Sequence, residues 1–366
     1  MKWSWRLGRL FGIDINVHAT FPILIVWVAV GAYQRTGTLA GSLADVSFIL
    51  AVFGTVVLHE LGHALTARRF GVGTKDITLL PIGGVARLER IPERPGQELA
   101  IALAGPAVNL VLAGVLFVLL AAGGQPIIFE DASLIAGGPI LERLFWVNLF
   151  LAAFNMLPAF PMDGGRVLRA LLALRGDYVR ATRMAARLGQ AVAFLLGLLG
   201  LFSNPFLVLV ALFVWTGAAA EAGAVETRAA LAGLLVDAAM ITNFESLPGT
   251  TTVGVAAERL LAGSQTDFPV VDPAGRPVGV LTRTDLIGGL TRNGPNAIVS
   301  EVMTRQFATA APTEMLGDAL ARLQTCECHS LPVVLGQRVV GMITMENIGE
   351  FMTVQTALRT PRQAQV

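Results

Sequence analysis

Charged residues are scarce in this chain. Asp, Glu, Lys and Arg make up 14% of its 366 residues, whereas typical soluble domains carry about 25%. Hydrophobic residues reach 54%, which excludes an ordinary soluble domain and predicts a protein whose solvent is the lipid bilayer. The polar residues are concentrated after about residue 222, where we place a domain boundary.

Cysteine is nearly absent as well. The two cysteines, Cys326 and Cys328, are two residues apart, so a disulfide between them would be strained and we expect reduced cytosolic thiols. A disulfide scaffold is excluded, and a cysteine-based zinc site has no support. His329 follows these cysteines, but ordinary packing explains this segment better than a metal site does.

No small-residue cleavage pattern follows the first apolar stretch, Ala19 to Tyr33, so we predict a retained helix in preference to a secretory signal. Six apolar stretches are long enough to cross a hydrocarbon core of about 30 Å. They are Val17 to Tyr33, Val46 to Phe70, Leu99 to Ala122, Pro139 to Leu157, Leu188 to Phe202 and Pro205 to Ala220. A re-entrant hairpin is an alternative for the last two.

Basic residues are nearly missing from one side of the predicted spans. With the N-terminus inside, the cytoplasmic segments hold fifteen Lys and Arg residues, and the opposite side holds at most Arg35 and Arg143. Basic loops stay in the cytoplasm, so we expect a multi-pass plasma-membrane protein with its N-terminus and C-terminal domain in the cytoplasm. The arginines from Arg166 to Arg187 are expected to face lipid headgroups, and no nucleic acid partner is expected.

Two loop segments alternate polar and apolar residues as strands do, Leu10 to Val17 and Lys75 to Leu88, the latter interrupted by Pro81-Ile82-Gly83-Gly84. One interpretation is a small hairpin that only organises the loops. The other is an unpaired edge, at Gly83 and Gly84, that binds an extended substrate by strand addition.

After residue 222 the chain repeats itself at a period of about 62 residues. The segment from Asp267 to Leu286 returns as Ser330 to Ile348, and each copy predicts strand, turn, strand and helix. The pair resembles tandem CBS modules, the small domains named after cystathionine beta-synthase. We expect a transmembrane domain at 1–222, a linker at 223–236, CBS modules at 237–292 and 293–353, and a disordered tail at 354–366.

The second predicted span contains His59-Glu60-Leu61-Gly62-His63. On a helix the two histidines share one face, so both imidazoles can bind one metal while Glu60 handles protons. A histidine pair that only caps the bundle would not explain Glu60, because a charged residue at bilayer depth costs about 2.5–3.5 kcal/mol.

A catalytic zinc site normally takes a third protein ligand. His18 precedes the first span and His329 lies in the repeat, so a carboxylate is the better candidate. Asp163 follows the fourth span in a segment whose prolines and glycines break the helix and let its side chain turn back toward the bundle.

These motifs together resemble the site-2 protease family of intramembrane metalloproteases, in the branch with C-terminal CBS modules. Ala104 to Asn109 in the third span and the Gly83-Gly84 loop extend the resemblance over nearly the whole chain. The fold class it implies is a polytopic α-helical membrane protein, with about six transmembrane helices and a C-terminal α/β tandem CBS domain.

The resemblance implies one Zn²⁺ per chain, bound by His59, His63 and Asp163, with Glu60 as the catalytic general base. It implies cleavage of transmembrane segments near the cytoplasmic face, as in regulated intramembrane proteolysis. The expected partners are single-span membrane proteins, such as a membrane-tethered transcription regulator or an anti-sigma factor. Asn155 is expected either to bind substrate or an oxyanion, or only to end a helix.

In CBS modules a Thr and an acidic residue three positions later bind a nucleotide ribose, and Thr282 and Asp285 match that pattern. Thr344 is followed by Asn347, which departs from it. An adenine nucleotide on the first module and a purely structural or homodimerising role both stay open.

Two other functions compete. A CBS-regulated channel or transporter needs polar residues along several helices, whereas the intramembrane ionisable residues here gather in one cluster. An inactive relative is disfavoured because His59, Glu60, His63 and Asp163 are all intact.

Overall fold

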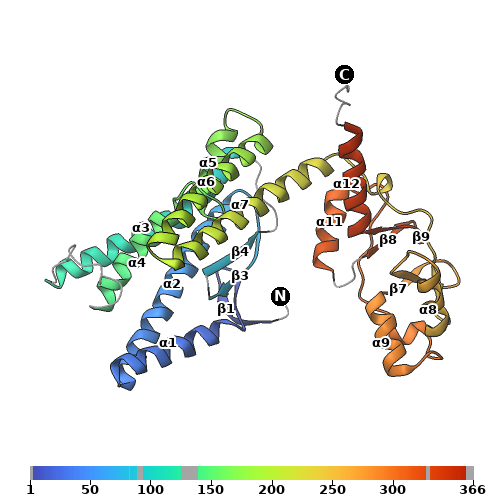
Figure 1. The fold of residues 1–366 in the computed structure, drawn as a ribbon, viewed down its shortest axis with the longest axis horizontal. Helices are drawn as coiled ribbons and strands as arrows, with labels where there is room; N and C mark the ends of the chain where they lie inside the picture. The colour runs from blue at the N-terminus through green and yellow to red at the C-terminus, as the bar shows by residue number, and fades with distance from the viewer. Residues whose placement is uncertain (1–2, 82, 89–93, 125–138, 327–329, 360–366) are drawn as a thin grey trace. The chain divides into compact units, whose positions relative to one another are not determined.

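A computed structural model describes residues 3–81, 83–88, 94–124, 139–326 and 330–359. The chain divides into two units, Met1–Val225 and Glu226–Val366, and Figure 1 labels most of their helices and strands. Ile82, Cys328, His329 and residues 360–366, to which expectations above refer, lie outside the described residues.

The first unit is mainly helical. Its helices are α1 (Phe21–Thr36), α2 (Leu39–Arg69), α3 (Pro95–Ala122), α4 (Ile140–Asn155), α5 (Asp163–Ala173), α6 (Tyr178–Phe202) and most of α7 (Pro205–Leu231), whose last residues belong to the second unit. Within the described residues, four helices are long and apolar enough to cross a membrane: α2, α3, α6 and α7. Since α1 and α4 have 16 residues each, roughly 24 Å, the count of six spans stays a prediction.

Local sequence explains where the long helices begin and end. The Thr38 side chain accepts a hydrogen bond from the Gly41 amide and caps α2, and the Asp177 carboxylate does the same for α6 through Arg180. Because of the Asp177 cap, α6 starts ten residues before the predicted Leu188. With 25 and 27 residues, α6 and α7 each have the length of a full crossing, which disfavours the re-entrant hairpin.

A four-stranded sheet belongs to the same unit. Its strands lie in the order β1 (Ser4–Leu10), β2 (Ile13–His18), β3 (Thr74–Leu80) and β4 (Gly83–Leu88). The pair β2 and β3 is parallel and the two outer pairs are antiparallel. Strands in both predicted segments are therefore confirmed, and β1 is an addition. Within the described residues β4 pairs with β3 alone, so it is an edge strand.

The sheet packs on α2 through apolar side chains. Ile13, Ile15 and Ile77 form one buried cluster with Leu61 and Ala64. Leu61 and Ala64 flank the histidine His63 on α2, so this contact fixes the sheet against the segment that carries the predicted metal ligands.

The second unit contains the two repeats. The first comprises the 3₁₀ turn η2 (Val236–Ala238), β5 (Leu247–Pro248), α8 (Val253–Ala262), β6 (Phe268–Val271), β7 (Pro277–Leu281) and α9 (Arg283–Asn293). The second comprises α10 (Val299–Val302), α11 (Leu316–Thr325), β8 (Ser330–Leu335), β9 (Arg338–Thr344) and α12 (Met345–Arg359). Each has an antiparallel strand pair followed by a helix, which confirms the predicted strand–turn–strand–helix pattern.

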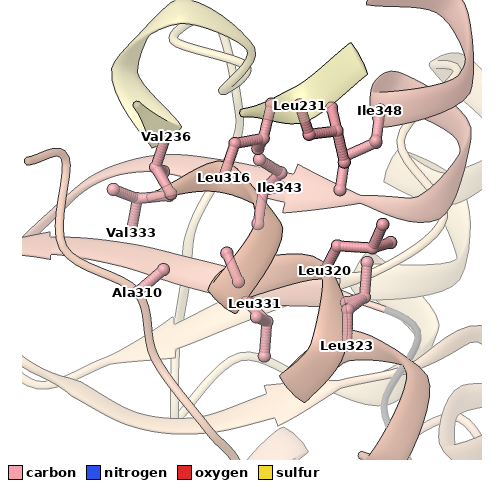
Figure 2. Packing of buried hydrophobic residues seen from close by; sticks show 11 residues of the cluster. Leu231, Val236, Ala310, Leu316, Leu320, Leu323, Leu331, Val333, Ile343 and Ile348 are labelled. Carbon is pink, nitrogen blue, oxygen red and sulfur yellow. The ribbon is translucent and has the colours of Figure 1, made fainter. Parts of the chain in front are cut away.

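The cores of the two repeats exchange segments. Figure 2 shows Leu231, the last residue of α7, and Val236 packed with Leu316, Leu331 and Ile343 of the second repeat. Conversely, Val299 and Met303 pack in the core of the first repeat. The predicted boundary between residues 292 and 293 therefore does not separate the two cores.

Residues 223–231 of the predicted linker form the end of α7, a run without proline; the linker assignment itself stays a prediction. Two other expectations need correction. Residues 354–359 of the predicted disordered tail are helical, because α12 is held by Phe351 and Met352 against the second core. Cys326 is disulfide-bonded, so the prediction of reduced thiols is wrong for it.

Candidate metal centre

The side chains of His59, His63 and Asp163 converge on one point. The Oδ2 atom of Asp163 lies 3.2 Å from His59 Nε2 and 3.1 Å from His63 Nε2, and the two Nε2 atoms are 3.1 Å apart. A tetrahedral zinc ion with bonds of about 2.0–2.2 Å has ligands about 3.3 Å apart. The three atoms are thus spaced as zinc ligands are.

All three side chains are shielded from solvent. His59, His63 and Asp163 have relative exposures of 6%, 5% and 8%. Among the described residues, their nitrogen and oxygen atoms form the one cluster that could hold a metal ion. Burying two imidazoles and a carboxylate together is costly unless they are paired or bind a metal. The donor set, two nitrogens and one oxygen, is one that zinc uses in catalytic sites.

The far nitrogen of each imidazole is held by an oxygen. His63 Nδ1 donates to the backbone carbonyl of Ile101 at 2.7 Å, and His59 Nδ1 donates to the side-chain oxygen of Asn109. Both oxygens can only accept, so the ring protons are on Nδ1 and the Nε2 lone pairs face the shared point. This is the tautomer that binds a metal through Nε2.

Helix α3 approaches the histidines closely because small residues line the contact. A Cβ added at Gly62 of α2 would lie 2.9 Å from the Ala104 carbonyl oxygen. Gly105 of α3 faces the Nε2 atoms of both histidines with no room for a side chain. The predicted packing element Ala104 to Asn109 therefore contacts the site itself.

Asp163 is the first residue of α5, and the glycines after it allow its position. A Cβ at Gly164 would lie 2.2 Å from the Leu157 carbonyl oxygen, and one at Gly165 would lie 2.6 Å from the Phe160 nitrogen. The start of α5 is thus packed directly on the backbone of the segment that precedes it. That packing turns Asp163 toward α2.

Glu60 lies beside the edge strand of the sheet. A Cβ added at Gly84 would be 2.9 Å from Glu60 Cγ and 2.9 Å from Val56 Cγ1. Gly83 has a φ of 141°, a conformation that favours glycine. The structure therefore brings the predicted Gly83-Gly84 segment and the predicted general base together.

Neither Asn155 nor His18 belongs to the cluster of His59, His63 and Asp163. Asn155 is the half-buried last residue of α4, and its side chain has no hydrogen bond among the described residues. His18 ends β2, and its Nδ1 pairs with the Thr20 hydroxyl at 2.8 Å. It does not belong to the ligand group.

Thr282 and Asp285 form a capping box at the start of α9, in the second unit. The Thr282 hydroxyl donates to Asp285 Oδ2 at 2.8 Å, and the Thr304 hydroxyl donates to the same oxygen at 2.9 Å. In the other repeat the hydroxyl of Thr344 donates to the side-chain oxygen of Asn347 at 2.6 Å. The Asn347 backbone amide also donates to the Thr344 hydroxyl at 3.2 Å, so both Thr residues cap the helices that follow them.

Sequence reasoning missed a buried ion cluster around Arg169, which lies on the same helix as Asp163. Arg169, 1% exposed, donates to Glu98 Oε1 and to Glu221 Oε1, each at 2.7 Å. Its guanidinium also lies 4.9 Å from the centre of the Phe160 ring. The expectation of a lipid-facing arginine is wrong for Arg169. Its acidic partners are 71 and 52 positions away, and no local pattern indicates such pairs.

Comparisons with known proteins agree with the division of the chain. The model for peptidase family M50 matches residues 47–130 and 126–196, and the model for the CBS domain matches residues 236–292 and 299–353. The chain is 34% identical to zinc metalloprotease MJ0392 of Methanocaldococcus jannaschii, over 97% of each chain. It is 32% identical to Rip3 of Mycobacterium tuberculosis, over 97% of this chain and 94% of that protein.

A solved structure, the site-2 protease from Methanocaldococcus jannaschii, is also similar. It has 41% sequence identity and covers 60% of this chain and 95% of its own, with a TM-score of 0.44.

Proposed function

We propose, from the premise that the chain belongs to peptidase family M50 and carries a CBS pair, that it cleaves the transmembrane segments of other membrane proteins near the cytoplasmic face. As a member of that family the chain is a zinc metalloprotease with membrane-spanning helices. The observation that carries the proposal is the convergence of His59, His63 and Asp163 inside the helical unit.

We assign these three residues as the ligands of one Zn²⁺ and Glu60 as the general base. When bound, zinc supplies a Lewis acid that polarises a carbonyl and lowers the pKa of a water molecule toward about 7. Glu60 accepts the proton of the attacking water and passes it to the leaving amine. Its place next to His59 on α2, with its Cγ against Gly84, supports this role.

A substrate helix must unwind before it is cut, because its peptide bonds are hidden in the helix. Within the described residues β4 pairs along one edge alone. Its other edge would accept an extended segment by strand addition, which would hold that segment beside Glu60. Gly83 and Gly84 would then bind the substrate backbone. Asn155, at the end of α4, would steady the substrate or the oxyanion.

The orientation follows from the basic residues. His59 and His63 lie toward the end of α2 that carries Arg68 and Arg69 in its last turn. Basic residues favour the cytoplasmic side, which supports cleavage near that face, with the N-terminus and CBS pair in the cytoplasm of a plasma-membrane protein. The substrates we propose are single-span proteins such as membrane-tethered transcription regulators and anti-sigma factors.

The CBS pair is the proposed regulatory part. An adenine nucleotide would bind at Thr282 and Asp285, whose side chains already meet at the start of α9. A structural or homodimerising role for the pair remains the alternative. Binding of AMP and ATP to the full chain, compared with Thr282→Val, distinguishes the two, because the nucleotide role requires the hydroxyl.

The proposed activity is tested by co-expression with a panel of tagged single-span membrane proteins. The native chain is expected to release a tagged fragment that Glu60→Gln does not release. Glu258→Gln, which changes an exposed residue of α8, is the control and should cleave like the native chain. Equal cleavage by the native chain and Glu60→Gln would overturn the mechanism.

A further inference from the structure

A line of hydrogen-bonded side chains runs from His59 into the helical interior. His59 Nδ1 donates to Asn109 Oδ1 of α3, and Asn109 Nδ2 donates to Asn148 Oδ1 of α4 at 3.0 Å. Asn148 Nδ2 then donates to the backbone carbonyl of Leu144 at 2.9 Å. Asn109 and Asn148 are both 0% exposed. The line joins α2, α3 and α4.

The hydrogen bond from Asn148 to the Leu144 carbonyl fixes the orientation of both amide groups. The Leu144 carbonyl can only accept, so the NH₂ group of Asn148 must face it and the Asn148 oxygen must face Asn109. Asn109 in turn must point its NH₂ group at Asn148 and its oxygen at His59. His59 therefore carries its proton on Nδ1, which leaves Nε2 as a lone-pair donor toward Asp163 and His63.

The opposite orientation of the amides would prevent His59 from binding a metal ion. If the Asn109 amide were reversed, its NH₂ group would meet His59 Nδ1, and the ring proton would have to move to Nε2. A protonated Nε2 cannot bind a metal ion. The direction of two buried amides thus decides whether His59 can act as a ligand.

The tautomer of His63 does not depend on the orientation of a side-chain amide. Its Nδ1 donates to the backbone carbonyl of Ile101, which is part of α3 and cannot reverse. His59 relies on a side-chain amide, which can rotate by 180° unless a further partner holds it. That difference suggests that Asn148 serves to hold the Asn109 amide in place, since its own hydrogen bonds go to Asn109 and Leu144.

We propose that Asn148 is a positioning residue that acts through Asn109 to hold His59 in the tautomer that binds zinc. The inference rests on the proposed metal site and adds a determinant of its affinity. A packing role alone would be served as well by Leu, which has the same branched shape as Asn. Two amides buried in an apolar interior are costly unless their hydrogen bonds are made.

The test uses the full chain in detergent micelles with Zn²⁺ and Co²⁺ as probes. Zinc affinity is measured by competition with a chelator, and the visible absorption of bound Co²⁺ reports ligand number and geometry. Asn148→Leu is expected to weaken zinc binding on the order of 10–100-fold and to alter the Co²⁺ spectrum. Unchanged affinity and spectrum in Asn148→Leu would overturn the inference.

Asn148→Asp separates direction from packing. A buried carboxyl stays protonated, so it can donate its O–H to the Leu144 carbonyl and accept from Asn109 with its other oxygen. Zinc affinity within about threefold of native is expected, because the direction of the line is kept. A loss in Asn148→Asp as large as in Asn148→Leu would also overturn the inference.

Two further measurements keep the outcomes distinct. Ser42→Ala removes a different, part-buried side-chain hydrogen bond of α2, from the Ser42 hydroxyl to the Ala29 carbonyl, and should leave zinc affinity unchanged. His59→Ala should lose zinc altogether. A native chain that binds no zinc would overturn the proposed function and this inference together, whereas native binding that is indifferent to Asn148→Leu overturns this inference alone.

Discussion

Gly105 lies directly against the imidazole of His63: a Cβ added at Gly105 would come within 2.2 Å of the His63 Nε2 atom. The same Cβ would lie 2.6 Å from His59 Nε2. The backbone of α3 therefore borders the Nε2 edges of both histidines. Even one methyl group there must displace an imidazole.

Gly105→Ala is accordingly expected to lower zinc affinity by at least about tenfold, since displacing a ligand costs as much as losing a residue that orients it. Gly114→Ala is the matched control, because Gly114 lies on the same helix and its Cβ would meet nothing within 4 Å. Chelator competition measures both. Equal affinities in the two variants would contradict the geometry of the site.

Gly84→Ala should separate catalysis from metal binding. Its new Cβ would press on Glu60 Cγ and Val56 Cγ1, both 2.9 Å away, and misplacing a catalytic group by about 1 Å can cost about 100-fold in rate. We expect cleavage to fall by about tenfold or more while zinc affinity stays native. Gly8→Ala, a strand glycine with open space around its Cβ, should change neither. A Gly84→Ala chain that cleaves normally would exclude Gly84 from the active site.

Removing the metal should destabilise the native chain. A ligand that binds only the folded state, at 100 times its Kd, stabilises that state by about 2.7 kcal/mol. Adding a chelator to the native chain should therefore lower its unfolding temperature, measured by circular dichroism. His59→Ala should show no such shift, and a shift of equal size in that variant would mean that the metal binds elsewhere.

Arg169→Met should destabilise the helical unit strongly. The substitution leaves Glu98, 4% exposed, without its buried partner, and breaking a buried ion pair costs about 3–5 kcal/mol. Arg6→Gln removes an exposed pair with Asp14 and should cost about 1 kcal/mol or less. Thermal unfolding of the full chain compares the two variants. Similar losses of unfolding free energy would show that the buried Arg169 cluster adds no more stability than an exposed ion pair.

Leu331→Ala should destabilise the second unit, because Leu331 lies in the core of the second CBS repeat. Leu331 is fully buried in the cluster of Figure 2, and replacing a buried Leu by Ala costs about 2–5 kcal/mol. Leu335 lies on the same strand and is 62% exposed, so Leu335→Ala should cost no more than about 0.5 kcal/mol. Equal effects on the unfolding of this unit would contradict the assigned core.

The convergence of His59, His63 and Asp163, which we propose as the zinc ligands, could be anticipated because their pattern is local or occurs in a known family. His59 and His63 share a helix face by spacing alone, and Asp163 followed from the resemblance and from the helix-breaking residues around it. The strands at Ile13–His18 and Thr74–Leu80 were visible as alternating residues. Local periodicity carries that information without any knowledge of packing.

The supporting residues could not be predicted in the same way. Asn109 and Asn148 lie in apolar helices, and only the rotation of each packed helix decides which polar side chains meet. Arg169 pairs with acids on other helices, which no local rule relates to it. The two repeats have nearly the same apolar pattern, so the sequence does not tell which core Val236 or Val299 joins.

Helix α2 is longer than the membrane is thick. Its 31 residues extend roughly 46 Å, against a hydrocarbon core of about 30 Å. Such a helix tilts more in a thin bilayer than in a thick one, and His59 and His63 tilt with it. The lipid composition of the host cell would then set the depth at which a peptide bond meets Glu60, so the same chain could prefer different scissile bonds in membranes of different thickness.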